Sequence, residues 1–358
     1  MKKLKLFYLF PLVVLVFFSS LNSTAQIKDL GNFLASGVDD AQNLFKPYLE
    51  PYINGFGASM TGGWYNTAKV HKLGGFDLTI TFNTGIVPKD KQSFDLSEVD
   101  INSLRLHDAT NPISPTIAGA KESGPQMDYN LPGYNVKAFD MPQGVNNRFV
   151  PSPMIQLGFG LIKGTQVMGR YMPTLKLGGS SVGMWGIGGM HSLKQWIPFM
   201  KNLPVLEVSV MYGFTKLTSN VAMSVTPDDI GAGGLPSNYN GTWDDQKMNF
   251  VAKSSTANLV ISANLPVVCF YGSVGFATTK TNLKLNGHFP YVNIGTSGAQ
   301  VDALLDPINM QIKNQDGGVT KPRFNIGMRI KMAVITIHFD YTKANYSVAT
   351  AGLGISFR

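Results

Sequence analysis

The chain has 358 residues, with 38 glycines, 15% charged side chains and a formal net charge of +8. Its single cysteine, Cys269, excludes an intrachain disulfide and a metal site built on thiolates. The positive charge is not gathered into a Lys/Arg cluster, which argues against nucleic-acid binding. A mildly basic surface beside acidic lipid headgroups or lipopolysaccharide explains the charge more simply.

The first 25 residues have the three-part pattern of an export signal. Lysines follow Met1, residues 7–18 are apolar apart from Pro11, and small side chains at 23–25 precede Gln26. The apolar run is shorter than the roughly 20 residues that a membrane-spanning helix needs. We therefore expect residues 1–25 to be a cleavable signal peptide rather than an anchor. No later stretch is apolar enough for a spanning helix, so an exported protein that stays in a membrane must form a closed β-barrel.

Residues 26–73 are expected to form a helical segment before the first strand. Residues 27–52 place apolar side chains at helical spacing, and Pro47 and Pro51 are expected to end this helix. A glycine-rich stretch with Trp64 at its centre follows. The segment could plug the barrel, cap its mouth or extend into the periplasm, and the pattern does not separate these alternatives. The side chains that would make plug contacts are Phe45, Tyr48, Tyr52, Trp64 and Tyr65.

Residues 74–358 predict an all-β fold, a transmembrane antiparallel barrel. Ten segments alternate apolar with polar or small side chains, as strands with a lipid face and a lumen face do. They are 75–85, 152–162, 165–175, 181–191, 205–216, 252–265, 267–283, 322–332, 333–343 and 345–357. The segment 181–191 alternates poorly. Parts of 103–107, 134–139 and 55–69 could add strands, so we expect about 10 to 14 in total.

The connections between these strands fall into two groups. With the carboxyl terminus in the periplasm, tight turns lie on one side, at 163–165, 265–266 and 332–333. The other side has one short connection, 176–180, and three long outer loops, at 86–151, 217–251 and 284–321. This sorting is typical of barrels in the cell outer membrane, and a two-sheet sandwich gives no reason for it.

One inner connection is longer than the others. Residues 192–203 predict a short amphipathic helix. It would rest on the inner leaflet with Trp196 at headgroup level, or fold beneath the barrel floor.

Polar side chains on the inward faces are the candidate lining of the lumen. Small neighbours such as Gly158 and Gly352 leave room there for a passage or a plug. The candidate lumen residues are Gln156, Arg329, Lys331, Thr336, His338 and Asp340.

Catalysis has little support in the sequence. His338 and Asp340 share a strand face, but same-face neighbours are about 7 Å apart, and Ser356 would have to approach from another strand. The motifs of zinc proteases, serine hydrolases, P-loops and EF-hands are missing. The acidic pairs 228–229 and 244–245 could hold a divalent cation, although acidic loop residues are usually just solvated. We expect no enzyme activity, no catalytic residue, no cofactor and no metal.

Five segments resemble an uncharacterised outer-membrane barrel family of Bacteroidota, over nearly the whole mature chain. They are Gly63-Trp64-Tyr65-Asn66-Thr67, Gly75-Phe76-Asp77, Pro142-Gln143-Gly144, Ile155-Gln156-Leu157 and Lys194-Gln195-Trp196-Ile197-Pro198. More distantly, a helical segment before a barrel is similar in architecture to the long-chain fatty-acid transporter superfamily. Its members carry hydrophobic compounds through a plugged barrel. This second likeness carries over no residues, and fold alone does not establish function.

The function expected from these observations is a passive channel for small hydrophobic or amphipathic solutes. The alternative is a non-conducting barrel that supports the envelope or binds a partner, and a lumenal or lipid-face hydrolase is third. Expected partners are outer-membrane lipid, lipopolysaccharide, a hydrophobic small molecule and the barrel-insertion machinery, but not nucleic acid. That machinery would read the last strand through Leu353, Ile355 and Phe357, although Arg358 departs from the usual aromatic end.

Overall fold

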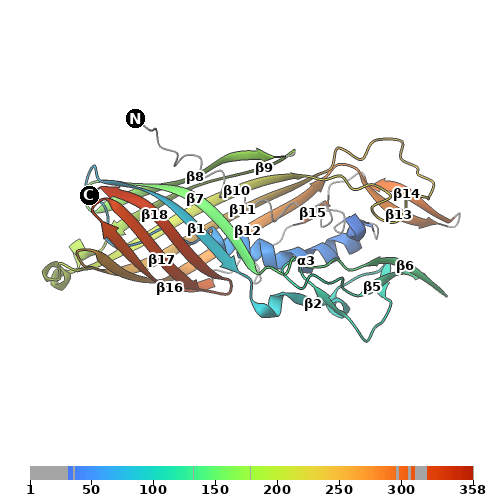
Figure 1. Ribbon diagram of the computed structural model, residues 1–358, viewed down its shortest axis with the longest axis horizontal. Coiled ribbons are helices and arrows are strands. Elements are labelled where there is room, and N and C mark those ends of the chain that lie inside the picture. The colour runs from blue at the N-terminus through green and yellow to red at the C-terminus, as the bar shows by residue number, and fades with distance from the viewer. Residues whose placement is uncertain are drawn as a thin grey trace.

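The computed structural model describes residues 31–34, 37–131, 133–177, 179–295, 298–304, 308–310 and 321–357. The expected signal peptide lies outside these residues. Figure 1 shows a barrel at one end of the molecule and the outer connections gathered at the other, with a helix between them.

Ten antiparallel strands close into a barrel. In chain order they are β1 (Phe76–Ile86), β7 (Phe149–Gly160), β8 (Thr165–Leu177), β9 (Ser180–Ser192), β10 (Leu206–Ala222), β11 (Lys247–Asn264), β12 (Val268–Asn286), β16 (Lys321–Met332), β17 (Ile335–Lys343) and β18 (Ser347–Phe357). Pairing of β1 with β18 and of β11 with β12 completes the ring. All ten predicted strands are confirmed, and their number is at the low end of the expected range.

The side chains that alternate along each strand in the sequence point alternately into the barrel and out of it. In β1, Thr79, Thr81 and Asn83 are buried inside, whereas Phe76 and Leu78 are exposed. Because both faces repeat around the ring, the outer surface is an apolar band suited to lipid. Leu353, Ile355 and Phe357 lie on this band, and their reading by insertion machinery stays a prediction. Among the described residues, no helix is long and apolar enough to span a membrane.

The sorting of connections is also confirmed. The turns 161–164, 265–267 and 333–334 and the connection 193–205 lie at the end with Phe357, and the long connections lie at the other. The expected amphipathic helix at 192–203 is wrong. Two 3-10 helices stand there instead, η5 (Lys194–Trp196) and η6 (Pro198–Asn202). The proline forces the preceding Ile197 into extended backbone, so one continuous helix cannot form.

The long connections form an outer domain of small sheets. β2 (Ser93–Asp95) pairs with β4 (Ile113–Pro115), and β3 (Leu104–Leu106) with β5 (Gln126–Leu131), which also pairs with β6 (Tyr134–Asp140). β13 (Phe289–Gly295) pairs with β14 (Gly298–Leu304), and β15 (Ile308–Met310) with β12. Two turns of 3-10 helix, η3 (Lys89–Lys91) and η4 (Leu96–Glu98), belong to the same domain. The segments at 103–107 and 134–139 therefore form strands, but they pair locally and do not extend the barrel.

The helix α3 (Val38–Ser59) connects the two parts (Figure 1). It continues through Pro47 and Pro51, so the expectation that these prolines end it is wrong. Each proline removes one intrahelical hydrogen bond. Tertiary packing stabilises the helix instead, because Leu44, Phe45 and Tyr48 are buried against the outer domain. We call residues 38–75, which run from α3 down to β1, the inner segment.

Candidate functional site

Arginines of the barrel wall hold the inner segment in the lumen. Arg170 on β8 donates from Nη1 to the Met60 carbonyl at 3.2 Å and from Nη2 to the Gly62 carbonyl at 2.7 Å. Its Nε donates to Gln156 at 2.8 Å, and its guanidinium lies 3.6 Å from the centroid of the Trp64 ring. One wall side chain therefore fixes both the backbone and the indole of the inner segment.

Two further arginines act in the same way from β16. Arg323 donates from Nη1 to the Thr61 carbonyl at 2.9 Å, and Arg329 donates to the Asn66 side chain at 3.0 Å. Arg170, Arg323 and Arg329 are all buried. Within the described part of the chain none of the three forms an ion pair, and their hydrogen bonds go to neutral oxygens.

Glycines make the space that Trp64 occupies. Gly188 on β9 and Gly213 on β10 are paired across the strands. A Cβ would lie 2.7 Å from the Trp64 ring at Gly188 and 2.3 Å from it at Gly213. This also explains why the segment 181–191 alternates poorly, because glycine and methionine take its inward positions. The glycine pair is a signal that the sequence contained and that strand periodicity alone did not reveal.

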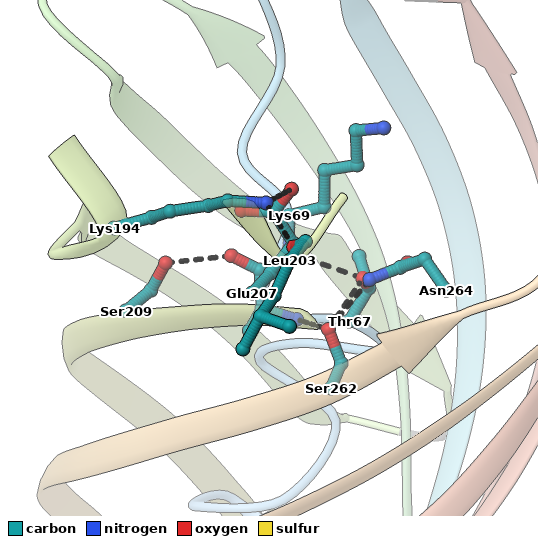
Figure 2. A network of polar contacts seen from close by, with 9 residues as sticks. Thr67, Lys69, Lys194, Leu203, Glu207, Ser209, Ser262 and Asn264 are labelled. Carbon is teal, nitrogen blue, oxygen red and sulfur yellow. Dashed lines mark hydrogen bonds and ion pairs between the residues drawn. The ribbon is translucent and has the colours of Figure 1, made fainter. Parts of the chain in front are cut away.

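The lower part of the inner segment is bound to the wall by hydroxyl and amide groups. Ser209 donates to the Ala68 carbonyl at 2.6 Å, and Ser262 accepts from the Ala68 N–H at 2.9 Å. Thr67 donates to Asn264 at 2.8 Å, as Figure 2 shows. Nearby, Lys194 of the inner connection donates to the Leu203 carbonyl at 2.8 Å. Polar contacts therefore continue to the periplasmic end.

Five of the six candidate lumen residues are buried inside the barrel, and Lys331 is half-buried near its lower rim. Asp340 accepts from Asn325 at 2.8 Å and from Tyr271 at 3.0 Å. Both ring nitrogens of His338 lack a hydrogen-bond partner among the described residues. Strand register places Gly352, not Ser356, opposite His338, so no acid–base–nucleophile arrangement forms there.

The candidate plug residues divide between two environments. Trp64 and Tyr65 lie inside the barrel, where the Tyr65 hydroxyl is 2.5 Å from Ser273. Phe45 and Tyr48 instead pack into the apolar core of the outer domain, and Tyr52 donates to the Asn147 carbonyl. The inner segment thus fills the lumen with its lower half and supports the outer domain with its upper half.

The acidic loop residues are not gathered into a metal site. Asp229 accepts from Thr226, and Asp245 is 2.7 Å from the His288 ring. A backbone hydrogen bond from His288 is the main reason why the pKa of Asp245 lies below its ordinary value. No group of three or more potential metal ligands occurs among the residues that the structure describes.

Three cavities border the inner segment. An outer cleft of about 510 Å³ lies between α3 and residues 90–100, and Tyr346 also lines it. A wall pocket of about 70 Å³ lies deeper, between α3 and strands β12, β16 and β18, and shares Tyr346 with the cleft. A polar cavity of about 20 Å³ lies near the periplasmic end, beside Arg329 and His71. We call the outer cleft and the wall pocket the upper cavities; Arg323 lines the wall pocket, and Arg329 lines the polar cavity.

A family model matches residues 1–357, and its description is "Family of unknown function (DUF6588)". The chain belongs to this family. No curated protein matches the sequence significantly. Membership accounts for the resemblance to an uncharacterised barrel family, whereas the Bacteroidota origin and the likeness to fatty-acid transporters stay expectations.

Outer-membrane barrels are among the similar solved structures. Outer membrane protein OprG from Pseudomonas aeruginosa is 11% identical, with a TM-score of 0.29 over 81% of this chain and 99% of that one. The toluene transporter TodX from P. putida is 10% identical, with a TM-score of 0.26 over 83% and 94%. Ail of Yersinia pestis, an attachment invasion locus protein, is 11% identical, with a TM-score of 0.27 over 80% and 98%. Scores this low carry no argument about solutes, and the barrel of this DUF6588 member is established by its own strand pairing.

Proposed function

We propose that this outer-membrane barrel is a gated channel for small amphipathic solutes, and that the state described here is the closed one. The observation that carries the proposal is the placement of the two upper cavities. Both follow α3 inward from the outer surface, both are lined by Tyr346, and the deeper one reaches Arg323. We infer a solute path through these cavities that stops where the inner segment meets the wall.

Amphipathic solutes suit these cavities better than purely hydrophobic ones. The outer cleft is lined by charged side chains, among them Lys46, Glu50 and Asp95, together with the ring of Phe94. The wall pocket adds alanines 58, 277 and 344 and Val348. A freely open passive channel, in contrast, would need continuous space, and the polar cavity beside Arg329 has a volume of only about 20 Å³.

The contacts that close the barrel are hydrogen bonds that water molecules can replace. Arg170, Arg323, Ser209 and Ser262 bind main-chain groups of the inner segment by hydrogen bonds, which water can replace when the segment moves. Two glycines at the start of the lumen portion, Gly62 and Gly63, give this backbone freedom, and Gly63 has φ 65°. Opening would therefore displace residues 60–72 while the wall stays paired.

A second candidate function is a non-conducting barrel that displays a partner-binding domain. The observation in its favour is the shared apolar core of α3 and the outer connections, which includes Phe45, Leu96, Leu104, Met127 and Phe289. Such a core gives the outer domain a defined shape with the cleft on its surface.

A reversible cross-link separates the two functions. In a Cys269→Ala background, Thr67→Cys and Ser262→Cys join the inner segment to β11, because the two native hydroxyls are 3.3 Å apart. Thr165→Cys with His191→Cys joins only β8 to β9, at positions paired in register, and is the matched control. Conductance in planar bilayers and solute uptake into liposomes are measured before and after reduction.

A gated channel predicts activity that disappears in the oxidised 67–262 protein and returns on reduction, with no redox effect in the control. A barrel that conducts nothing in either redox state, for any variant, contradicts the channel and leaves the displayed outer domain as the function.

A further inference from the structure

Lys321 and Arg323, both at the start of β16, line the wall pocket, and none of the described residues that line it is acidic. The pocket lies where the pairing of β12 with β16 ends, since Lys321 is opposite Ala277 while β12 continues to Asn286. Of the two cations, Arg323 is the one that is buried.

Arg323 is incompletely satisfied. Its side chain is 2% exposed. Nη1 donates to the Thr61 carbonyl at 2.9 Å and to Thr256 at 3.0 Å, and Nη2 donates to Thr342 at 3.2 Å. Its Nε has no partner among the described residues. Since a guanidinium carries five N–H groups, one N–H on Nη2 and the one on Nε remain.

A guanidinium can bind a carboxylate through two parallel N–H···O hydrogen bonds. The nearest charged candidate on the neighbouring strand, Asp340, is committed to Asn325 and Tyr271 and does not line the pocket. Asp340 attracts Arg323 electrostatically without accepting a hydrogen bond from it, so the buried Nε–H stays without an acceptor among the described residues. An anion in the pocket would complete the hydrogen bonding of Arg323.

The remaining lining defines the rest of the ligand. Ala58, Ala277, Ala344 and Val348 give an apolar wall, and threonine hydroxyls supply further donors. A volume of about 70 Å³ holds a molecule of a few heavy atoms. Apolar walls disfavour a doubly charged inorganic anion, which costs more free energy to desolvate than a monoanion.

We propose that the wall pocket binds a small monocarboxylate, with the carboxylate on Arg323 and a short apolar tail against the alanines. The proposal deepens the gated channel, and it rests on that function only in treating the bound acid as a solute on its way through.

The test uses butyrate as the probe and the full-length protein in deuterated detergent, with binding followed by saturation-transfer NMR. Wild type is expected to bind butyrate saturably, and Arg323→Gln to weaken binding by at least about thirtyfold, since a buried charged hydrogen-bond partner is lost. Arg329→Gln, which removes an equally buried arginine outside the pocket, is expected to bind as wild type does.

A second variant keeps the proposal testable if Arg323→Gln does not fold. Ala344→Leu fills the pocket from the half-buried turn between β17 and β18, keeps both cations and is expected to abolish binding. Binding that survives both Arg323→Gln and Ala344→Leu overturns the proposal. Equal competition by inorganic phosphate also overturns it, because the site would then be a general anion site.

The experiments can contradict the butyrate site and the channel independently of each other. A barrel that binds butyrate but never conducts upholds this site and contradicts the channel. A barrel that conducts but binds no butyrate upholds the channel and contradicts the site.

Discussion

At the scale of single residues, the packing of the lumen depends on a large side chain of the inner segment that fits against glycines of the wall. Trp64 fits because Gly188 and Gly213 leave its ring the space that two side chains would occupy. Because protein interiors are densely packed, one added methyl group is enough to disturb this fit. The inward glycines are therefore as much a part of the closed state as the arginines are.

Gly213→Ala tests this match. The new methyl group would lie 2.3 Å from the indole, so the ring must move, and we expect the free energy of unfolding to fall by about 1–3 kcal/mol. Guanidinium unfolding followed by tryptophan fluorescence measures it. Gly169→Ala is the control, because nothing lies within 4 Å of its Cβ position. Equal stability of the two variants would contradict the packing argument.

Asp245 gives the outer domain an acid-sensitive contact. Hydrogen bonds from His288 keep the folded pKa of this carboxyl below its ordinary value of 3.8. Because the folded pKa is the lower one, the stabilisation is complete above the ordinary value and is lost as the pH falls through the folded pKa. We expect pepsin to cut residues 223–246 only below about pH 4 in wild type, and already at higher pH in Asp245→Asn. The same pH profile for Asp245→Asn and wild type would refute this, and Asp244→Asn is the control.

At the scale of elements, α3 organises the outer domain more than its sequence suggests. Its prolines cost hydrogen bonds, yet the helix persists to Ser59 because its apolar face is buried by connections distant in sequence. Phe33, Phe45 and Tyr48 pack edge to face in that core.

Phe45→Ala measures the contribution of α3. Removing a fully buried ring should destabilise the outer domain by about 3–5 kcal/mol and leave the barrel paired. Limited proteolysis of the outer connections should accelerate, while heat-modifiable migration in detergent gels stays as in wild type. Lys46→Ala, an exposed neighbour on the same helix, is the control. Loss of heat-modifiability in Phe45→Ala would mean that the barrel itself depends on this core.

At the scale of the whole molecule, the orientation follows from the sorted connections. We expect the outer domain to face the exterior, and the short turns and the 3-10 helices to face the periplasm. In a Cys269→Ala background, a maleimide polymer too large to cross the outer membrane should label Asn240→Cys on intact cells. It should label Phe199→Cys, whose native ring is 68% exposed, only after lysis. The reverse pattern would invert the proposed topology.

The sequence by itself determined the wall of this protein. Period-two alternation specifies the ten strands because each side chain must face either lipid or lumen, and that choice is local. It also identified Gln156, Arg329 and His338 as inward-facing. The end of α3 was not predictable from local signals, because the burial that outweighs Pro47 and Pro51 comes from residues 96–139 and 283–301.

Only the tertiary structure decided what fills the barrel. Whether residues 60–72 lie in the lumen depends on contacts with strands that begin and end far away in the chain. That Arg323 Nε has no acceptor among the described residues becomes evident only once β16 is placed against β12 and the Thr61 carbonyl. Which N–H groups find an acceptor depends on their neighbours in three dimensions. An unsatisfied N–H group therefore cannot be predicted from the sequence alone.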